Sequence, residues 1–128
     1  MHVLMDSSIY CNDPKRGSAG FRAISRLAAA GRISIHVPYY VYKEFVTHQE
    51  DQLKNAIQKI RQGATTLTRL TDDQGIMSTA EAVLKKAGAL ETNLAAHAEE
   101  PFSTWITNVR AILQPVPKGR ARVGPPAE

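Results

Sequence analysis

Two carboxylates in the first third of the chain have the surroundings of a metal-binding pair. Asp6 ends an apolar run of strand length and is followed at once by Ser7 and Ser8, while Glu44 comes just beyond a second such run. Mg²⁺ and Mn²⁺ prefer oxygen ligands and often take only one or two protein carboxylates, and such an ion can activate water for attack on a phosphodiester. Asp6 and Glu44 are therefore the candidate metal ligands and catalytic residues. The neighbouring serine hydroxyls are candidates for holding the Asp6 carboxylate in place.

Each carboxylate also has a structural explanation. An aspartate followed by two serines is typical of a turn that caps the next segment, which would account for Asp6. Glu44 taken alone is typical of an exposed helix residue that pairs with Lys43 or His48. The metal-binding hypothesis therefore depends on whether the fold brings the two carboxylates together.

The first 46 residues have the pattern of a strand, a helix and a second strand. Strands are predicted over residues 2–5 and 32–37, where apolar and β-branched residues run together and Pro38 stops the second run. The helix between them has apolar residues at helical spacing and a glycine just past its end: Phe21, Ile24, Leu27, Ala28 and Gly31. A connection of this length implies parallel strands with a right-handed crossover. Both strands then end at the edge where α/β sheets bind ligands, so Asp6 and Glu44 are expected side by side.

The middle of the chain predicts a long helical hairpin over residues 47–97. Apolar residues at steps of three and four continue a helix from the end of the second strand to about Leu70. A break is expected at Gln74-Gly75, and a second helix returns over residues 77–94. The two helices would pack their apolar stripes against one another.

The remainder of the chain predicts little further structure. Pro101 is expected to close the hairpin, and Ser103 can cap a short helix over residues 103–113. Residues 114–128 are rich in proline, glycine and basic residues, which is typical of a tail or a truncated end. The fold class is therefore α/β: a βαβ unit of a parallel sheet with a helical hairpin, forming one domain over residues 1–113.

Charge and cysteine content narrow the possible partners and compartments. The formal net charge is +4, and four cations lie close in sequence to Asp6, where they could contact phosphates or simply form a solvated helix surface: Lys15, Arg16, Arg22 and Arg26. Cys11 is the only cysteine, which excludes an internal disulfide and a cysteine-based zinc cage. No run of about 18 apolar residues and no signal peptide is present, so we expect a cytoplasmic protein without a membrane partner.

The motifs around both carboxylates resemble those of the PIN-domain family of metal-dependent ribonucleases. Residues 4–9 are similar to the family's first motif, a hydrophobic strand ending in Asp, then a hydroxyl residue, a small polar residue and an apolar one. Residues 37–45 are similar to its second, in which a strand reaches Pro and a helix presents an acidic residue followed by an apolar one. The resemblance implies that Asp6 is the first metal ligand, Glu44 the second, and Ser7 the residue that orients Asp6.

The resemblance also implies properties of the whole protein. These are a three-layer α/β/α fold, three or four acidic residues that bind Mg²⁺ or Mn²⁺, and endonucleolytic hydrolysis of RNA, with the four cations as RNA contacts. The helical pair resembles the insertion of larger bacterial members, in contrast to the short toxins of toxin–antitoxin pairs.

The sequence departs from the family pattern toward its carboxyl end. After Glu100 the chain has only Glu128, so the later acidic ligands and the later strands are not found. We therefore expect an amino-terminal or truncated portion of a PIN-like ribonuclease with an incomplete sheet. The alternative is a catalytically inactive relative that acts as an RNA-binding module, or as a protein-interaction module whose hairpin binds a partner or a second copy.

Overall fold

A computed structural model of the chain describes residues 1–114. These residues form three strands and five helices, and they divide into two compact units. The sheet unit consists of Met1–Thr47 and the chain from Phe102 onward, and the hairpin unit consists of His48–Pro101. Among the residues described, no helix is both long enough and apolar enough to cross a membrane.

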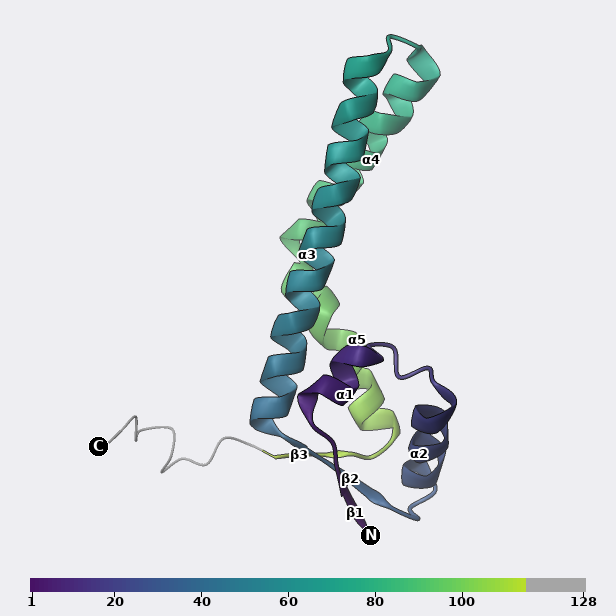
Figure 1. Cartoon of the computed structure of the whole chain (residues 1–128), viewed down its shortest axis with the longest axis vertical. Coiled ribbons are helices and arrows are strands. Elements are labelled where there is room, and N and C mark those ends of the chain that lie inside the picture. The colour runs from purple at the N-terminus through teal and green to yellow at the C-terminus, as the bar shows by residue number, and fades with distance from the viewer. Residues whose placement is uncertain (115–128) are drawn as a thin grey trace, which may run out of the picture. The chain divides into compact units, whose positions relative to one another are not determined.

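The sheet is parallel, and its strands are β1 (His2–Leu4), β2 (Ser34–Pro38) and β3 (Ile112–Gln114) in that order across the sheet (Figure 1). This confirms the α/β class and the parallel pairing of the first two strands. Ile35 and Val37 of β2 are completely buried on one face of the sheet. On the other face Leu4 is 62% exposed and its neighbour across β2, Ile112, is 46% exposed. The described helices therefore pack on one face, and a three-layer arrangement stays a prediction.

An aromatic core fills the space between the buried sheet face and the helices of the sheet unit. These helices are α1 (Ser7–Asn12), α2 (Ala19–Ala29), the first turns of α3 (Tyr39–Leu70) and the last turns of α5 (Leu94–Asn108). Tyr10 of α1 is at the centre, with its ring centroid 5.1–6.1 Å from those of four other aromatic residues: Phe21, Phe45, Phe102 and Trp105. Aromatic side chains from α2, α3 and α5, two of them from α5, thus fix α1 over the sheet.

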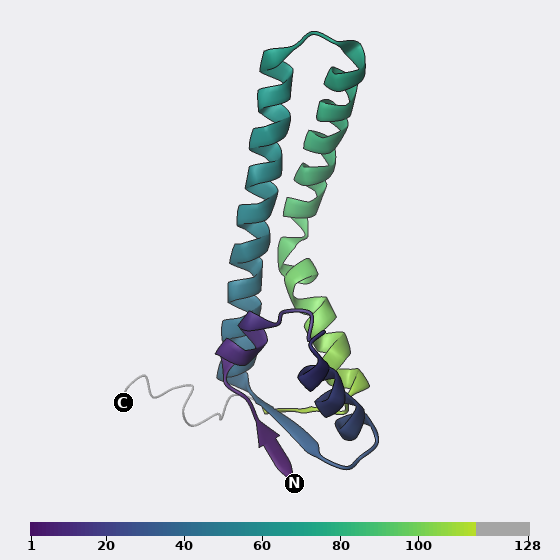
Figure 2. The same ribbon diagram turned by 45° about the vertical axis from the view of Figure 1, so that its right-hand side comes forward.

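The hairpin unit is held together mainly by small side chains. Within it α3 runs antiparallel to α4 (Gln74–Thr92), and the two helices lie side by side in Figures 1 and 2. The buried residues of this unit are mostly alanines: Ile57, Ala64, Ala80, Ala87, Leu94 and Ala98. An ion pair joins α3 to α4, between Arg61 Nη2 and Glu91 Oε1 at 2.8 Å. Small residues allow the two helix backbones to approach closely.

The break between the hairpin helices lies earlier than the sequence predicted. α3 ends at Leu70, as expected, but α4 already begins at Gln74. Asp73 caps it, because its Oδ2 accepts a hydrogen bond from the backbone N–H of Ile76 at 3.0 Å. An aspartate cap outweighs the helix-breaking tendency of Gly75 at this position.

The carboxyl-terminal elements also differ from the expected short helix over residues 103–113. α5 starts before Pro101 and continues through it, because a single apolar stripe at helical spacing joins both parts: Leu94, Ala98, Phe102, Ile106 and Val109. The helix stops at Asn108, and Arg110 then takes a left-handed conformation with φ of 58°. The chain leaves it as β3, a strand that the sequence did not predict. Of the expected tail over residues 114–128, all but Gln114 lies outside the described residues.

Candidate active site

Asp6 lies just beyond the carboxyl end of β1 and caps α1. The backbone N–H of Ser7 donates a hydrogen bond to Oδ1 at 2.8 Å, and the hydroxyl of Ser8 donates to Oδ2 at 3.2 Å. The side chain is exposed, and each carboxylate oxygen can accept more than the one hydrogen bond it receives here. Asp6 is thus both held in one orientation and open to a further ligand.

Glu44 lies in the second turn of α3, which begins directly after β2. Because β1 and β2 are parallel, this start of α3 is at the same sheet edge as Asp6. The side chain is exposed, and within the described part of the chain it forms no ion pair with Lys43 or His48. The structural explanation of Glu44 as a paired surface residue is therefore not supported.

Cys11 is influenced by the charges of both carboxylates. Its thiol is half-buried near the end of α1. Burial raises its pKa, and the negative charges of Glu44 and then Asp6 raise the pKa further. Both charges thus act on Cys11, but among residues 1–114 these three side chains do not form a metal-holding group.

Asp6 and Glu44 offer the oxygen ligands that a hard divalent cation prefers, but they are only two residues. Among residues 1–114, no group of three or more His, Cys, Asp or Glu side chains is arranged to hold a metal ion. Glu99 and Glu100, the last acidic residues before Glu128, belong to the hairpin unit. Two carboxylates fit Mg²⁺ or Mn²⁺ when water and substrate phosphate complete the shell. The arrangement can thus bind a metal only together with other oxygen ligands.

Comparison with known protein families gives the chain its assignment. A family model described as PIN domain matches residues 3–121, nearly the whole chain. The chain belongs to the PIN-domain family. No curated protein and no solved structure gives a significant match. Family membership indicates a nuclease-type function that depends on a metal ion and involves RNA.

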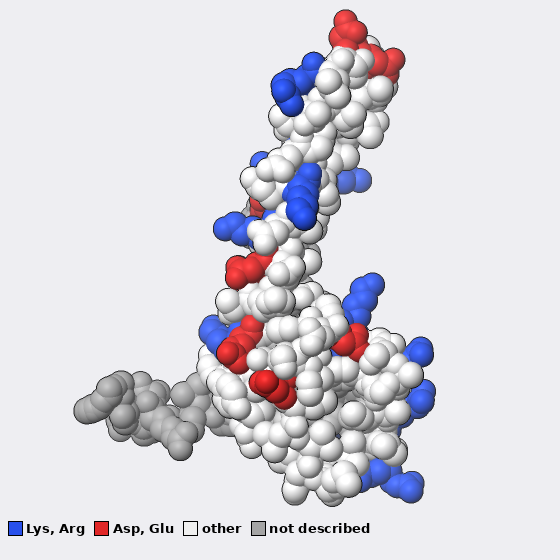
Figure 3. All heavy atoms as spheres, viewed as in Figure 1, with Lys and Arg blue, Asp and Glu red and all other residues white. Residues whose placement is uncertain are grey.

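Three of the four cations that lie close in sequence to Asp6 are on the surface of this PIN domain. Lys15 precedes α2, and Arg22 and Arg26 are one turn apart on it; all three side chains are exposed. Figure 3 shows basic side chains along the outer side of the sheet unit, where Figure 1 places α2. These cations can contact a bound polyanion.

Arg16 differs from the other three because it packs into the PIN domain's aromatic core. Its guanidinium carbon lies 5.4 Å from the ring centroid of Phe102 and 5.5 Å from that of Trp105, and Nη1 donates to the carbonyl of Pro14 at 2.6 Å. Burial lowers its pKa, an effect that the charges of Asp13 and Tyr10 oppose. These contacts indicate a structural role for Arg16.

Two tyrosines close in sequence to Glu44 were not predicted as site residues. Tyr39 and Tyr40 open α3 immediately after β2, and their side chains are 38% and 64% exposed. Tyr40 is one helical turn before Glu44, so the two share a face of the helix. A signal was present in the sequence, because two adjacent aromatic residues follow a strand-ending proline at a ligand-binding edge. Only the exposure separates them from core residues such as Phe45.

Proposed function

We propose that this PIN domain is a metal-dependent endoribonuclease in which Asp6 and Glu44 hold Mg²⁺ or Mn²⁺. The observation that carries the proposal is that Asp6 and the start of α3, which bears Glu44, follow the carboxyl ends of two paired parallel strands. Family membership supports a nuclease-type reaction. When bound, the ion can polarise a phosphodiester and lower the pKa of water.

The chain's own residues have distinct roles in this proposal. Asp6 and Glu44 supply negatively charged oxygens, and the hydrogen bond that the Ser8 hydroxyl donates keeps the Asp6 carboxylate from rotating. The backbone N–H of Ser7 does the same for the other oxygen. Because both acidic side chains are exposed, an extended strand of RNA can reach them.

Tyr40 is the proposed stacking platform for a base next to the scissile bond. An exposed aromatic ring offers such a base about 1–3 kcal/mol of stacking energy. Tyr40→Ala is therefore expected to weaken binding of single-stranded RNA roughly fivefold or more, as measured by anisotropy in EDTA so that no cleavage occurs. Tyr40→Phe keeps the ring and should bind like the parent chain. Equal binding by all three proteins would remove Tyr40 from the site.

Titration with Mn²⁺ and cleavage of single-stranded RNA test the metal site. Asp6→Asn should abolish saturable Mn²⁺ binding in calorimetry and reduce cleavage roughly 100-fold or more, since a catalytic metal contributes several kcal/mol. Asparagine also caps helices well, so this variant should fold normally. Asp72→Asn removes the same charge from an exposed position in the hairpin unit and serves as the control. Unchanged Mn²⁺ binding in both Asp6→Asn and Glu44→Gln would refute the proposal.

Alkylation of Cys11 tests the assembly of the site without any metal. Asp6→Asn and Glu44→Gln each remove a charge that raises the pKa of the thiol, so each should lower that pKa and speed alkylation by iodoacetamide at a fixed pH. Because Cys11 is the only cysteine, the rate reports on this site alone. The Asp72→Asn control should leave the rate unchanged. If neither variant alters it, the two carboxylates do not converge on Cys11.

A second candidate function is RNA binding without hydrolysis. It is favoured by the absence of a third acidic residue from the site within residues 1–114. Lys15, Arg22 and Arg26 would then contact phosphates, and binding would weaken steeply with salt whether or not a metal is present. Salt-insensitive binding would exclude this function. A protein partner or second copy bound through the hairpin stays a prediction, which light scattering at high concentration can test.

A further inference from the structure

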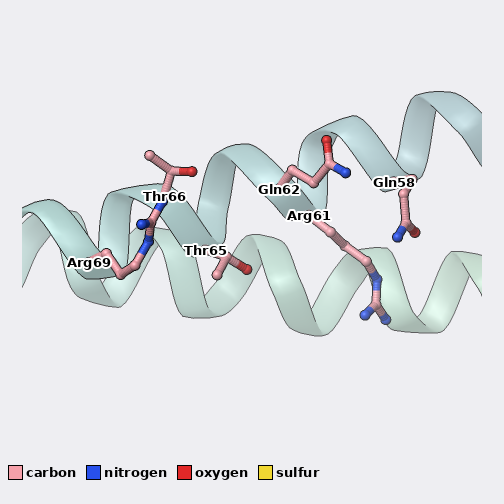
Figure 4. A pocket seen from close by; sticks show the side chains of 6 residues that line it. All are labelled: Gln58, Arg61, Gln62, Thr65, Thr66 and Arg69. Carbon is pink, nitrogen blue, oxygen red and sulfur yellow. The ribbon is translucent and has the colours of Figure 1, made fainter.

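A groove on the hairpin unit, lined by residues with polar side chains, has no role in the proposed reaction. It has a volume of about 440 Å³ and is lined only by residues of α3: Gln58, Arg61, Gln62, Thr65, Thr66 and Arg69. Figure 4 shows these six side chains along one stretch of the helix, with Arg61 reaching toward the neighbouring helix. Every lining residue carries a hydrogen-bond donor, and none is acidic. The groove is thus chemically suited to an anionic ligand with several acceptor oxygens.

The spacing of the lining residues gives the groove a linear form. They follow the i, i+3, i+4, i+7, i+8 and i+11 positions of a helix, which share one face. At 1.5 Å per residue the donors extend over roughly 16 Å, and the two guanidinium-bearing positions, Arg61 and Arg69, are about 12 Å apart along the axis. A ligand that contacts both arginines must therefore be extended and carry more than one negative charge.

The charge pattern of this segment supports the same ligand class. Between Asp51 and Asp72 the chain has no acidic residue but carries four cations: Lys54, Lys59, Arg61 and Arg69. Figure 3 shows basic side chains spaced along the hairpin unit, with acidic ones at the turn between α3 and α4 and others further along the helices. An exposed helix selected for stability alone would alternate Glu with Lys at i, i+4 positions. This segment therefore contributes no carboxylate of its own to the groove, and Glu91, which contacts Arg61, comes from α4.

Helix stability does not explain the composition of the groove either. Thr65 and Thr66 are weak helix formers, and Gly63 beside them costs about 1 kcal/mol relative to alanine. No atom lies within 4 Å of the position that a Gly63 side-chain carbon would take, so close packing does not require this glycine. Hydroxyl, amide and guanidinium donors here thus replace residues that would make a more stable helix.

Arg61 is only partly engaged by the protein. Its Nη2 contacts Glu91 at 2.8 Å, but the two side chains are 39% and 31% exposed, and such pairs are weak in water. A guanidinium has five N–H donors, so one carboxylate contact leaves others available for a ligand. Arg69 is exposed and forms no ion pair among the described residues.

We propose that this α3 groove binds the phosphodiester backbone of single-stranded nucleic acid, with Arg61 and Arg69 each contacting a phosphate. The choice of RNA as the natural ligand rests on the proposed function, but the groove lies within the hairpin unit and does not involve Asp6 or Glu44. Glutamine and threonine donors contact the intervening backbone oxygens. Such contacts hold a strand without reading its sequence.

Fluorescence anisotropy of the full chain with a labelled oligouridylate RNA, in EDTA, tests the groove independently of catalysis. Arg61→Gln/Arg69→Gln should weaken binding roughly 10-fold and reduce the slope of log K against log salt by about 1.4, since each phosphate contact on a single strand contributes about 0.7. The matched control, Lys85→Gln/Lys86→Gln, removes two exposed charges from α4 outside the groove and should change binding far less. An equal loss in both double variants, or no loss in the first, overturns the proposal.

Two single variants separate local contacts from net charge. Thr66→Val removes a donor without changing charge or branching and should weaken binding about twofold to fivefold. Glu91→Gln removes the competing carboxylate beside Arg61, but the charge change alone would also tighten binding. The gain in RNA affinity of Glu91→Gln should therefore exceed that of Glu81→Gln, which removes the same charge elsewhere on α4. Equal gains in affinity would count against a contact between Arg61 and the RNA. Asp6→Asn should retain groove binding in EDTA even if the metal site fails its own tests.

Discussion

The two units of this PIN domain are built on opposite packing principles. The core of the sheet unit is dominated by aromatic rings around Tyr10, whereas the buried residues of the hairpin unit are mainly alanines. Large rings bury much apolar area and are sensitive to truncation, while a seam of small residues is sensitive to enlargement. Opposite substitutions should therefore damage the two units: truncation the sheet unit and enlargement the hairpin unit.

The largest effect is expected from Phe102→Ala in the sheet unit. Phe102 is completely buried, and its ring centroid lies 4.6 Å from that of Phe45 and 5.1 Å from that of Tyr10. Its removal should lower the free energy of unfolding by about 3–5 kcal/mol. Trp105, the single tryptophan, reports on this unit by fluorescence during urea unfolding. A loss below about 1 kcal/mol would mean that the aromatic cluster does not stabilise the unit.

A smaller effect of the opposite kind is expected from Ala87→Leu in the hairpin unit. Ala87 is buried in contact with Ile57 and Leu94, so a larger side chain should overpack the seam and cost about 1–3 kcal/mol. Circular dichroism at 222 nm follows the loss of helix. The control, Ala89→Leu, adds the same atoms at an exposed position of α4 and should be tolerated. Equal stability of both variants would show that the seam is not closely packed.

Tyr10→Phe should stabilise the sheet unit by about 1 kcal/mol. The Tyr10 hydroxyl is buried and has no hydrogen-bond partner within the described part of the chain, so its removal relieves a desolvation cost without opening a cavity. Denaturant titration at neutral pH measures the gain. A destabilised variant would mean that the hydroxyl has a partner, such as a bound water.

Tyr10 should also make the folded protein less stable at alkaline pH. Burial raises the pKa of Tyr10 from 10.0 to about 12, against a smaller opposing effect of the Arg16 charge. Between pH 10 and about 12 the unfolded chain thus releases a proton that the folded chain keeps, so stability is complete below pH 10 and falls as pH rises. Thermal unfolding followed by Trp105 fluorescence should show this decline in the parent chain and a flatter profile in Tyr10→Phe. Identical profiles would assign the decline to other groups.

Glu91→Gln should have the smallest effect on stability. Its ion pair with Arg61 is partly exposed, so the loss should be at most about 1 kcal/mol. Urea unfolding followed by circular dichroism measures the change. A loss of several kcal/mol would show that the hairpin unit depends on this ion pair more than on its alanine seam.

The sequence predicted those elements whose apolar pattern is long and regular. β1, α2, β2 and the end of α3 at Leu70 all follow from periodicity and from breakers such as Gly31. α1 was missed because its six residues are too few to show a helical period. β3 was missed because the turn after α5 places Arg110 in a left-handed conformation, which is expected of glycine or asparagine.

The candidate site was accessible to sequence reasoning only in part. The position of Asp6 and Glu44 beyond parallel strands follows from the βαβ pattern, but the shared effect of both charges on Cys11 required the folded arrangement of α1. The inward position of Arg16 could not be foreseen, because it depends on aromatic rings that are far away in the sequence. Exposure, which distinguishes Tyr40 from Phe45, is likewise a property of the packed molecule.

The pairing of β3 with β2 has a consequence for the order of folding. Val37 and Leu113 are partners in the sheet, yet the entire hairpin unit separates them along the chain. Closing so long a loop carries an entropic cost that slows the formation of non-local contacts, whereas the hairpin forms through neighbours in sequence. We therefore expect stopped-flow refolding to show helical signal before Trp105 becomes buried, with β3 joining the sheet last.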